Sequence, residues 1–138
     1  MAKKDFFHYA VKRALEKDQW IITNDPLTLK VGGIQVEIDL GAENLIAADK
    51  NGEKIAVEIK SYIQPSATSE FHTSVGQYIN YRKALEKKEP ERTLFLAIPD
   101  DIYETFFNLP FIREVISENN IKIITYDPEE EIMVKWIR

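Results

Sequence analysis

Apolar residues recur along the chain with two different spacings, which separate predicted helices from predicted strands. In residues 5–17 they recur every three or four positions, and this spacing predicts an amphipathic helix. Apolar and polar residues then alternate, which predicts strands. These strands are 20–23, resumed over 28–31 after Asp25-Pro26, then 34–48 with a bend at Gly41, and 54–60. Gly32-Gly33 and Asn51-Gly52 supply tight turns between them.

The second half of the chain continues as helices and strands. The polar residues of 61–69 indicate a loop. A helix is predicted over 71–86, before Pro90. Residues 93–98 are nearly all apolar, as in a strand buried on both faces. Two short helices, at 103–107 and 111–118, and two strands, at 121–126 and 131–137, complete the prediction. The order is helix, three-strand meander, helix and strand with extra C-terminal elements, so we expect one α/β domain over residues 1–138.

Composition narrows the classes of protein. The chain has no cysteine, which excludes disulfides and thiolate metal sites and suits a reducing compartment. No run approaches the roughly 18 apolar residues of a membrane span, so we expect a cytoplasmic protein without membrane association. The formal net charge of −5 argues against a plain electrostatic binder of nucleic acid. It does not exclude a metal-dependent nuclease, because bound cations offset the repulsion between carboxylates and phosphate.

Glu58 and Lys60 are the strongest candidates for chemistry. Side chains alternate along a strand, so these two point to one face of strand 54–60 while Val57 and Ile59 point to the other, toward the core. A carboxylate binds a hard divalent cation, and an adjacent ammonium positions water or stabilises developing negative charge. The pair therefore predicts phosphodiester hydrolysis with Mg²⁺ or Mn²⁺ as cofactor.

A second metal ligand is expected on the preceding strand, at Asp39 or Glu43. Pairing outward from the Asn51-Gly52 turn places Leu45 opposite Glu58 and Glu43 opposite Lys60. Asp39 falls short of both in this register, and a bulge at Gly41-Ala42 would bring it nearer. Both carboxylates therefore stay candidates for the second ligand.

These residues resemble the PD-(D/E)XK nuclease superfamily, whose core has the same order of elements. Glu58-Ile59-Lys60 matches the (D/E)XK element. Asp39, in Glu37-Ile38-Asp39-Leu40, matches the preceding acidic position, with Ile38 where the motif has proline. The resemblance implies a restriction-endonuclease-like fold in which Glu58, the second acid and the carbonyl of Ile59 hold the metal.

The resemblance to RecB-like nucleases extends to the two predicted helices. Gln77 and Tyr81 form a Gln-x-x-x-Tyr pair on one face of the helix over 71–86. In RecB-like members such a pair lines the metal site, which implies the same role here. Related nucleases also place a residue of the first helix near the metal, and His8 matches that position, with Asp5 and Glu16 as alternatives.

Nearly the whole chain is similar to the XisH-like family, the fdxN element excision controlling factors. The similarity lies in seven segments: Lys4-Asp5-Phe6-Phe7-His8, Ile22-Thr23-Asn24-Asp25-Pro26-Leu27, Ile38-Asp39-Leu40-Gly41-Ala42-Glu43, Ile55-Ala56-Val57-Glu58-Ile59-Lys60-Ser61, Glu70-Phe71-His72, Gly76-Gln77-Tyr78 and Tyr126-Asp127-Pro128. It implies a role in programmed excision of a DNA element. The partners that it implies are DNA, an XisI-like protein and a site-specific recombinase.

Two functions are compatible with these patterns. One is a Mg²⁺-dependent deoxyribonuclease of the PD-(D/E)XK type, in which Lys60, Gln77, Tyr81 and His8 act beside the metal. The other is a non-catalytic accessory module that binds an XisI-like partner or a recombinase and regulates excision. The intact Glu-x-Lys and Gln-x-x-x-Tyr pairs favour the enzyme, whereas the acidic net charge favours the module. We favour the enzyme, and the sequence leaves a homodimer open.

Overall fold

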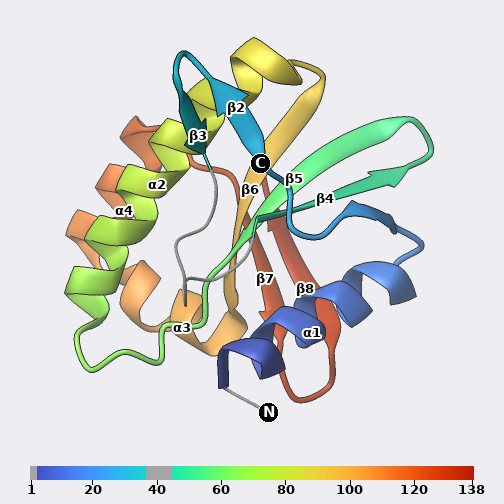
Figure 1. The fold of residues 1–138 in the computed structure, drawn as a ribbon. Helices are drawn as coiled ribbons and strands as arrows, with labels where there is room; N and C mark the ends of the chain where they lie inside the picture. The colour runs from blue at the N-terminus through green and yellow to red at the C-terminus, as the bar shows by residue number, and fades with distance from the viewer. Residues whose placement is uncertain (1–2, 37–44) are drawn as a thin grey trace.

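A six-stranded sheet runs through the computed structural model, which describes residues 3–36 and 45–138 (Figure 1). The helices described are α1 (Lys3–Lys17), α2 (Ala67–Lys88), α3 (Asp100–Glu104), the 3-10 helix η1 (Phe106–Asn108) and α4 (Pro110–Glu118). The strands described are β1 (Ile21–Asn24), β2 (Leu29–Val31), β3 (Ile34–Val36), β4 (Leu45–Lys50), β5 (Glu53–Ile59), β6 (Arg92–Pro99), β7 (Ile123–Asp127) and β8 (Ile132–Ile137). The fold is therefore a mixed α/β fold, as predicted.

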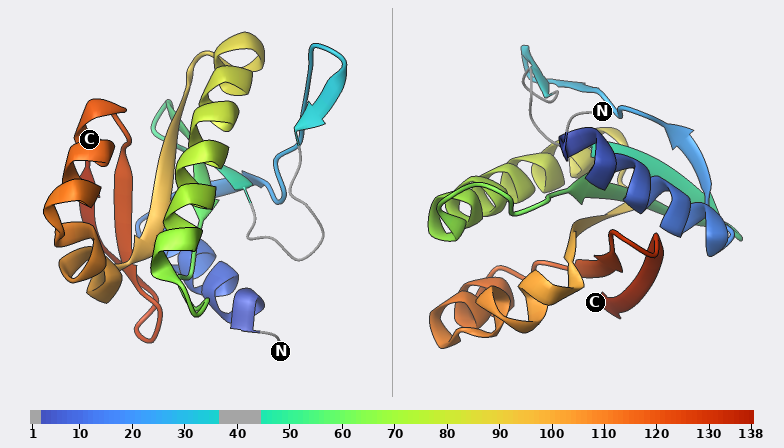
Figure 2. Two further views of the ribbon diagram at one scale, coloured as in Figure 1. Left: turned by 90° about the vertical axis from the view of Figure 1, so that its left-hand side faces the viewer. Right: turned by 90° about the horizontal axis from the view of Figure 1, so that it is seen from below.

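The sheet has the strand order β1-β4-β5-β6-β7-β8, with β5-β6 and β6-β7 parallel and the other neighbours antiparallel. Parallel neighbours need long crossover connections, and α2 and the α3-η1-α4 segment provide them. Figure 2 shows α1 on one side of the sheet and α2 with α4 on the other. Helices therefore cover both faces, so the central strands are buried on both.

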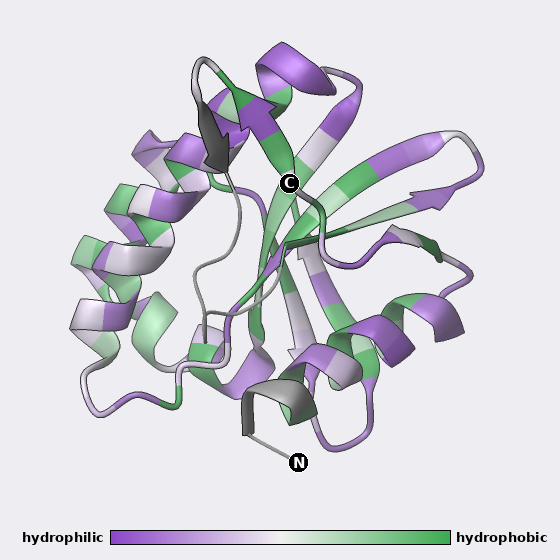
Figure 3. Ribbon diagram, in the orientation of Figure 1, coloured by the Kyte–Doolittle hydropathy of each residue, from purple (hydrophilic) through white to green (hydrophobic). Residues whose placement is uncertain are grey.

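Two apolar clusters hold these layers together. One lies between the sheet and α2 and includes Ala56 of β5 and Leu96 of β6, and the other lies between the sheet and α1 and includes Val57 and Phe95. Neighbouring residues of one strand thus enter different clusters, as the pleat requires. Figure 3 shows the apolar centre of β5 and β6 and the polar tip of the β4-β5 hairpin.

None of the helices in the described part of the chain has the length and apolar character that crossing a bilayer requires.

The predicted hairpin around Asn51-Gly52 is confirmed in its register. Leu45 pairs with Glu58, as outward counting from the turn predicts. Asn51 and Gly52 have φ angles of 50° and 83°, the left-handed conformation that a tight hairpin turn needs and that these residue types accept. Local sequence was thus sufficient to predict the position of Glu58 relative to the preceding strand.

The predicted meander differs in one strand. We expected 34–48 to form one strand next to 28–31, but β2 and β3 form a separate two-stranded sheet, and β4 pairs with β1. Leu27 and Leu29 explain the difference, because both are buried in the cluster under α2 and draw the chain away from the edge of the main sheet. The meander is therefore β1-β4-β5, with the β2-β3 hairpin inserted in it. The predicted bend at Gly41 lies outside the described residues.

Two helix boundaries also differ from the prediction. α2 begins at Ala67 instead of residue 71, because the Ser66 hydroxyl accepts a hydrogen bond from the Ser69 backbone N–H and caps the first turn. The helix expected at 103–107 is divided into α3 and η1. Thr105 separates them, with φ and ψ of −106° and −81°, outside the helical range.

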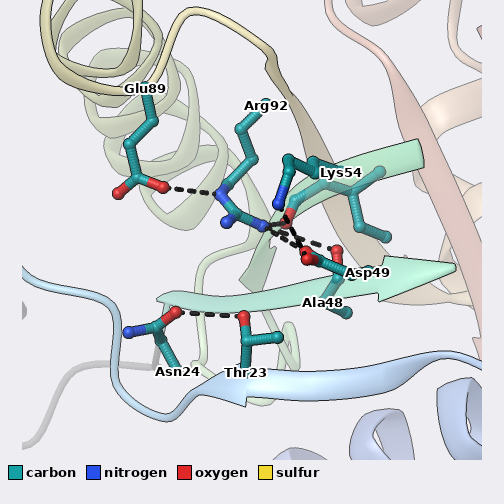
Figure 4. A network of polar contacts seen from close by, with 8 residues as sticks. Thr23, Asn24, Ala48, Asp49, Lys54, Glu89 and Arg92 are labelled. Atoms are coloured by element: carbon teal, nitrogen blue, oxygen red, sulfur yellow. Dashed lines mark hydrogen bonds and ion pairs between the residues drawn. The ribbon is translucent and has the colours of Figure 1, made fainter. Parts of the chain in front are cut away.

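Arg92, the first residue of β6, ties three elements together (Figure 4). Its Nη1 donates to Oδ1 of Asp49 and to the carbonyl oxygen of Ile55, both at 3.0 Å. Its Nε donates to Oε1 of Glu89, the residue that caps the end of α2, at 2.9 Å. Only 6% of the Arg92 side chain is exposed. The guanidinium therefore joins β6, the β4-β5 hairpin and the end of α2 where water is largely excluded.

Asp49 makes part of the free energy of unfolding dependent on pH. Hydrogen bonds from Lys54 and Arg92, the first being the larger cause, hold the pKa of Asp49 below its usual range. Such a carboxylate stabilises the fold above its unfolded pKa, and this contribution is lost as the pH falls through the folded pKa. We expect Asp49→Asn to lower the free energy of unfolding by about 1 kcal/mol at neutral pH. Urea unfolding across the acid range should show the difference shrinking below about pH 4; an unchanged difference would contradict it.

Candidate functional site

Glu58 and Lys60 lie at the carboxyl end of β5 and just beyond it, on the face of the sheet that α2 covers. Ala56, two residues earlier, belongs to the cluster under α2, whereas Val57 and Ile59 belong to the cluster under α1. Because helices cover both faces, the two charged residues are buried, with 1% and 3% of their surfaces exposed. A buried carboxylate and a buried ammonium are costly unless they compensate each other or serve a ligand.

The structure brings Glu58, Lys60 and Gln77 together. Nζ of Lys60 donates to Oε1 of Gln77 at 2.5 Å, and the same nitrogen lies 3.9 Å from Oε2 of Glu58. Gln77 lies on α2, which packs on this face of the sheet. A carboxylate, an ammonium and an amide thus meet in one buried place, with the ammonium between the other two groups.

Tyr81 lies one turn after Gln77 on α2. It is 7% exposed and belongs to the apolar cluster that also contains Ala56 and Tyr78. The shared helix face that i and i+4 spacing predicts is therefore present. The role of Tyr81 in chemistry stays a prediction.

The backbone of Lys60 is held as firmly as its side chain. Its N–H donates to the carbonyl oxygen of Ala97 on β6 at 2.9 Å, and its own carbonyl oxygen accepts a hydrogen bond from the Tyr126 hydroxyl at 2.9 Å. Tyr126 lies on β7 and is fully buried. We did not include Tyr126 among the site residues predicted from sequence, although it stands in a segment shared with the XisH-like family. Its part in positioning Lys60 depends on strand order, which no local pattern displays.

A second set of contacts joins the chain after Lys60 to α2. Tyr62 adopts a φ of 56°, in the left-handed region that residues with a side chain rarely occupy. Its hydroxyl donates to Oγ of Ser74 on α2 at 3.0 Å, and that Oγ donates to the backbone oxygen of Glu70 at 2.9 Å. These buried contacts fix α2 to the end of β5, one turn before Gln77. Sequence inspection did not single out Tyr62 or Ser74.

His8 lies on α1, which covers the other face of the sheet. Its Nε2 is 3.0 Å from Oδ2 of Asp25, and Nζ of Lys12 is 2.7 Å from the same oxygen. Burial raises the pKa of Asp25, but hydrogen bonds from Lys12 and His8 outweigh burial and lower it below the usual range. Within the described residues, Asp25 is therefore a carboxylate that lies beside His8. Of the alternatives, Glu16 is exposed. A role for the first helix at the metal stays a prediction.

Asp39 and Glu43 lie outside the described residues, so the choice between them stays open. They stand six and two residues before Leu45, which pairs with Glu58. Within residues 3–36 and 45–138, no group of three His, Cys, Asp or Glu residues is arranged to hold a metal ion. Of the three predicted metal ligands, Glu58 is therefore the one that the structure describes.

Comparisons with known proteins assign a family. A family model described as XisH protein matches residues 1–134. The chain is similar to the crystal structure of an XisH family protein from Nostoc punctiforme PCC 73102, with 54% identity, a TM-score of 0.91, and coverage of 97% of this chain and 100% of that one. It is also similar to a crystal structure described as an fdxN element excision controlling factor protein from Anabaena variabilis, with 52% identity, a TM-score of 0.90, and coverage of 97% and 99%. No curated protein matches.

Proposed function

The chain belongs to the XisH family, as the sequence predicted, and from this premise we propose that it takes part in excision of a DNA element through a divalent-metal-dependent nuclease site. The similar Anabaena variabilis protein is described as an fdxN element excision controlling factor, which supports the role in excision. The meeting of Glu58, Lys60 and Gln77 carries the proposal for a nuclease site.

The order of elements supports a core of the PD-(D/E)XK type. α1, the meander β1-β4-β5, α2 and β6 follow one another in the order that this superfamily has. Glu58-Ile59-Lys60 stands at the end of the third meander strand, where the (D/E)XK element is expected, and Gln77 reaches Lys60 from the following helix. Function depends on the site and not on the fold, so these contacts weigh more than the topology.

The residues present suit a hard divalent cation. Glu58 is a carboxylate beside a backbone that can contribute the carbonyl of Ile59, and Asp39 or Glu43 would add the second carboxylate. Oxygen ligands of this kind prefer Mg²⁺ or Mn²⁺ over softer metals. When bound, such an ion polarises a phosphate and lowers the pKa of water.

The chain's own residues would then do the positioning. Lys60, held by Gln77 at its Nζ and by Ala97 and Tyr126 at its backbone, would present a fixed ammonium to the attacking water and to the charge on phosphorus-bound oxygens. Gln77 would orient that ammonium and, with Tyr81, contact water or phosphate.

Burial supports the second candidate, a non-catalytic accessory module. Glu58 and Lys60 are only 1% and 3% exposed, and a phosphodiester must reach them for cleavage. The net charge of −5 also opposes binding of DNA in the absence of metal. In this case the chain would regulate excision by binding an XisI-like protein or a recombinase.

Thermal melting with and without millimolar Mn²⁺ tests the metal site directly. A cation that binds only the folded chain stabilises it by mass action, by about 1.4 kcal/mol when its concentration is ten times Kd. We expect Glu58→Gln to abolish this rise in Tm. Glu53→Gln is the matched control, because Glu53 lies on the same strand and pairs with Arg138 at the surface, so this variant should respond as the wild type does.

The same samples then separate the two functions. They are incubated with labelled linear, single-stranded and branched DNA in Mn²⁺. Cleavage that Glu58→Gln abolishes supports the nuclease. If Mn²⁺ does not change the Tm of the wild-type chain, the proposal of a metal site is wrong. If the wild-type chain binds Mn²⁺ and leaves all three DNA forms intact, the accessory module is favoured.

A further inference from the structure

A cavity of about 350 Å³ lies between α4 and the last strands of the sheet, away from the Glu58 site. Its apolar floor consists of Phe107, Ile116, Ile121, Ile123 and Ile137. None of the residues that line it belongs to the Glu58, Lys60 and Gln77 cluster. Its volume is within the range of small-molecule sites in proteins, roughly 300–1,000 Å³.

The wall formed by α4 is amphipathic. Ile116, Ser117 and Asn120 stand three, four and seven residues after Arg113, so the four residues line one face of the helix and its end. Ile116 packs against the apolar cluster, whereas Arg113 and Ser117 are exposed. This face thus presents a cation and a hydroxyl above an aliphatic floor.

Two cations that line the cavity have no carboxylate partner within the described residues. Within the described part of the chain, the side chains of Arg113 and Lys122 form neither an ion pair nor a hydrogen bond, although Arg92, Lys54 and Lys135 all have carboxylate partners. No aspartate or glutamate is among the described residues that line the cavity, in a chain whose net charge is −5. The charged side chains among the described lining residues are therefore all positive.

Arg138 also lines the cavity but does not add to this charge. Its guanidinium pairs with Oε2 of Glu53 at 3.0 Å and lies over the rings of Phe95 and Trp136, at 5.2 and 5.3 Å from their centroids. Phe95 and Trp136 pack in the cluster under α1, on the other face of the sheet. The free positive charge of the cavity thus comes from Arg113 and Lys122.

We propose that this cavity is a binding site for a small organic anion, with the anionic group on Arg113 and Lys122 and an apolar body on the isoleucine floor. An inorganic anion would leave the floor uncovered, and a neutral apolar molecule would leave both cations without a partner. A carboxylate and a phosphate ester share the required charge, and Arg113 and Lys122 suit either group.

Isothermal titration calorimetry with four probes tests this site and distinguishes the two anions. Octanoate and phenyl phosphate each combine an anionic group with an apolar body, octanamide lacks the charge, and inorganic phosphate lacks the body. We expect octanoate or phenyl phosphate to bind with a Kd on the order of 0.1 mM. Octanamide and inorganic phosphate should bind at least tenfold more weakly. Equal affinity for octanoate, phenyl phosphate and octanamide would overturn the proposal, as would no binding by either organic anion at millimolar concentration.

Two variants test whether the anion binds at this cavity. Arg113→Gln and Lys122→Gln should each raise the Kd of the preferred anion by about tenfold, since each removes one charge-assisted hydrogen bond. Both side chains are unpaired in the described structure, so these variants should fold as the wild type does. Lys83→Gln on α2, where Lys83 is exposed beside Glu86, is the control and should leave the affinity unchanged. If the two cavity variants bind as tightly as the wild type, the site is elsewhere and the proposal fails.

Discussion

Lys60→Met is expected to slow any metal-dependent DNA cleavage by about 100- to 1000-fold, the range seen when a preorganised donor is removed from a catalytic site. Methionine keeps most of the buried volume but lacks the ammonium that contacts Oε1 of Gln77 and lies 3.9 Å from Oε2 of Glu58. Stabilisation by Mn²⁺ should persist or grow, because the variant removes a positive charge near Glu58 that would repel the cation. Single-turnover cleavage and thermal melting on the same preparations measure both effects.

Lys54→Met is the matched control for this prediction. Lys54 is on β5, six residues before Lys60, but its side chain is 39% exposed and pairs with Asp49 instead of with the site. This variant should cleave at the wild-type rate. Wild-type cleavage by Lys60→Met would remove Lys60 from the mechanism. Loss of the Mn²⁺ response in Lys60→Met would show that the residue supports the metal site structurally and does not act in the chemical step alone.

Arg92→Met is expected to lower the free energy of unfolding by about 3 kcal/mol, because the backbone oxygen of Ile55 and two carboxylates lose a buried donor. Asp49 and Glu89 keep 30% and 28% of their side chains exposed, so water partly replaces the guanidinium and the loss stays below that of a fully buried ion pair. For a chain of this length the change corresponds to a fall in Tm of about 10 °C. Urea and thermal unfolding measure it.

Two further variants identify the cause of that loss. Arg13→Met removes an arginine that also contacts a glutamate, Glu131, at 2.8 Å, but its side chain is 51% exposed, so the cost should be under about 1 kcal/mol. Arg92→Lys keeps the charge and loses the planar fork, so it should fall between the wild type and Arg92→Met. Equal stability of Arg13→Met and Arg92→Met would contradict the view that burial gives Arg92 its importance.

Local sequence was sufficient for the elements that depend on neighbours along the chain. The spacing over residues 5–17 predicted α1, and Asn51-Gly52 predicted the register that places Leu45 opposite Glu58. The β2-β3 hairpin was not predicted as a separate sheet, because Leu27 and Leu29 have the alternation of an ordinary strand. Only the apolar surface of α2, supplied by residues far along the chain, determines which sheet they join.

Some features of the candidate site were likewise predictable from local sequence, and others depend on tertiary packing. Alternation along β5 was enough to place Glu58 and Lys60 on one face, and the resemblance to RecB-like nucleases directed attention to Gln77. The contact between Lys60 and Gln77 depends on the packing of α2 on this face of the sheet, and the hydrogen bond from Tyr126 joins residues 66 positions apart. The pairing of His8 with Asp25 likewise depends on how α1 approaches β1.

The sequence by itself therefore determined the family, the mixed α/β class, the strand that carries Glu58 and Lys60 and the face on which they stand. These properties depend on side-chain periodicity, turn chemistry and recognisable motifs, all of which are local. The tertiary structure alone decided that this face is buried, that Gln77 and Tyr126 hold Lys60, and that Arg113 and Lys122 line an apolar cavity whose described lining residues include no acid. The physical reason is that burial and pairing arise where separate elements pack, and the energy of a charge is set by the groups that packing brings around it.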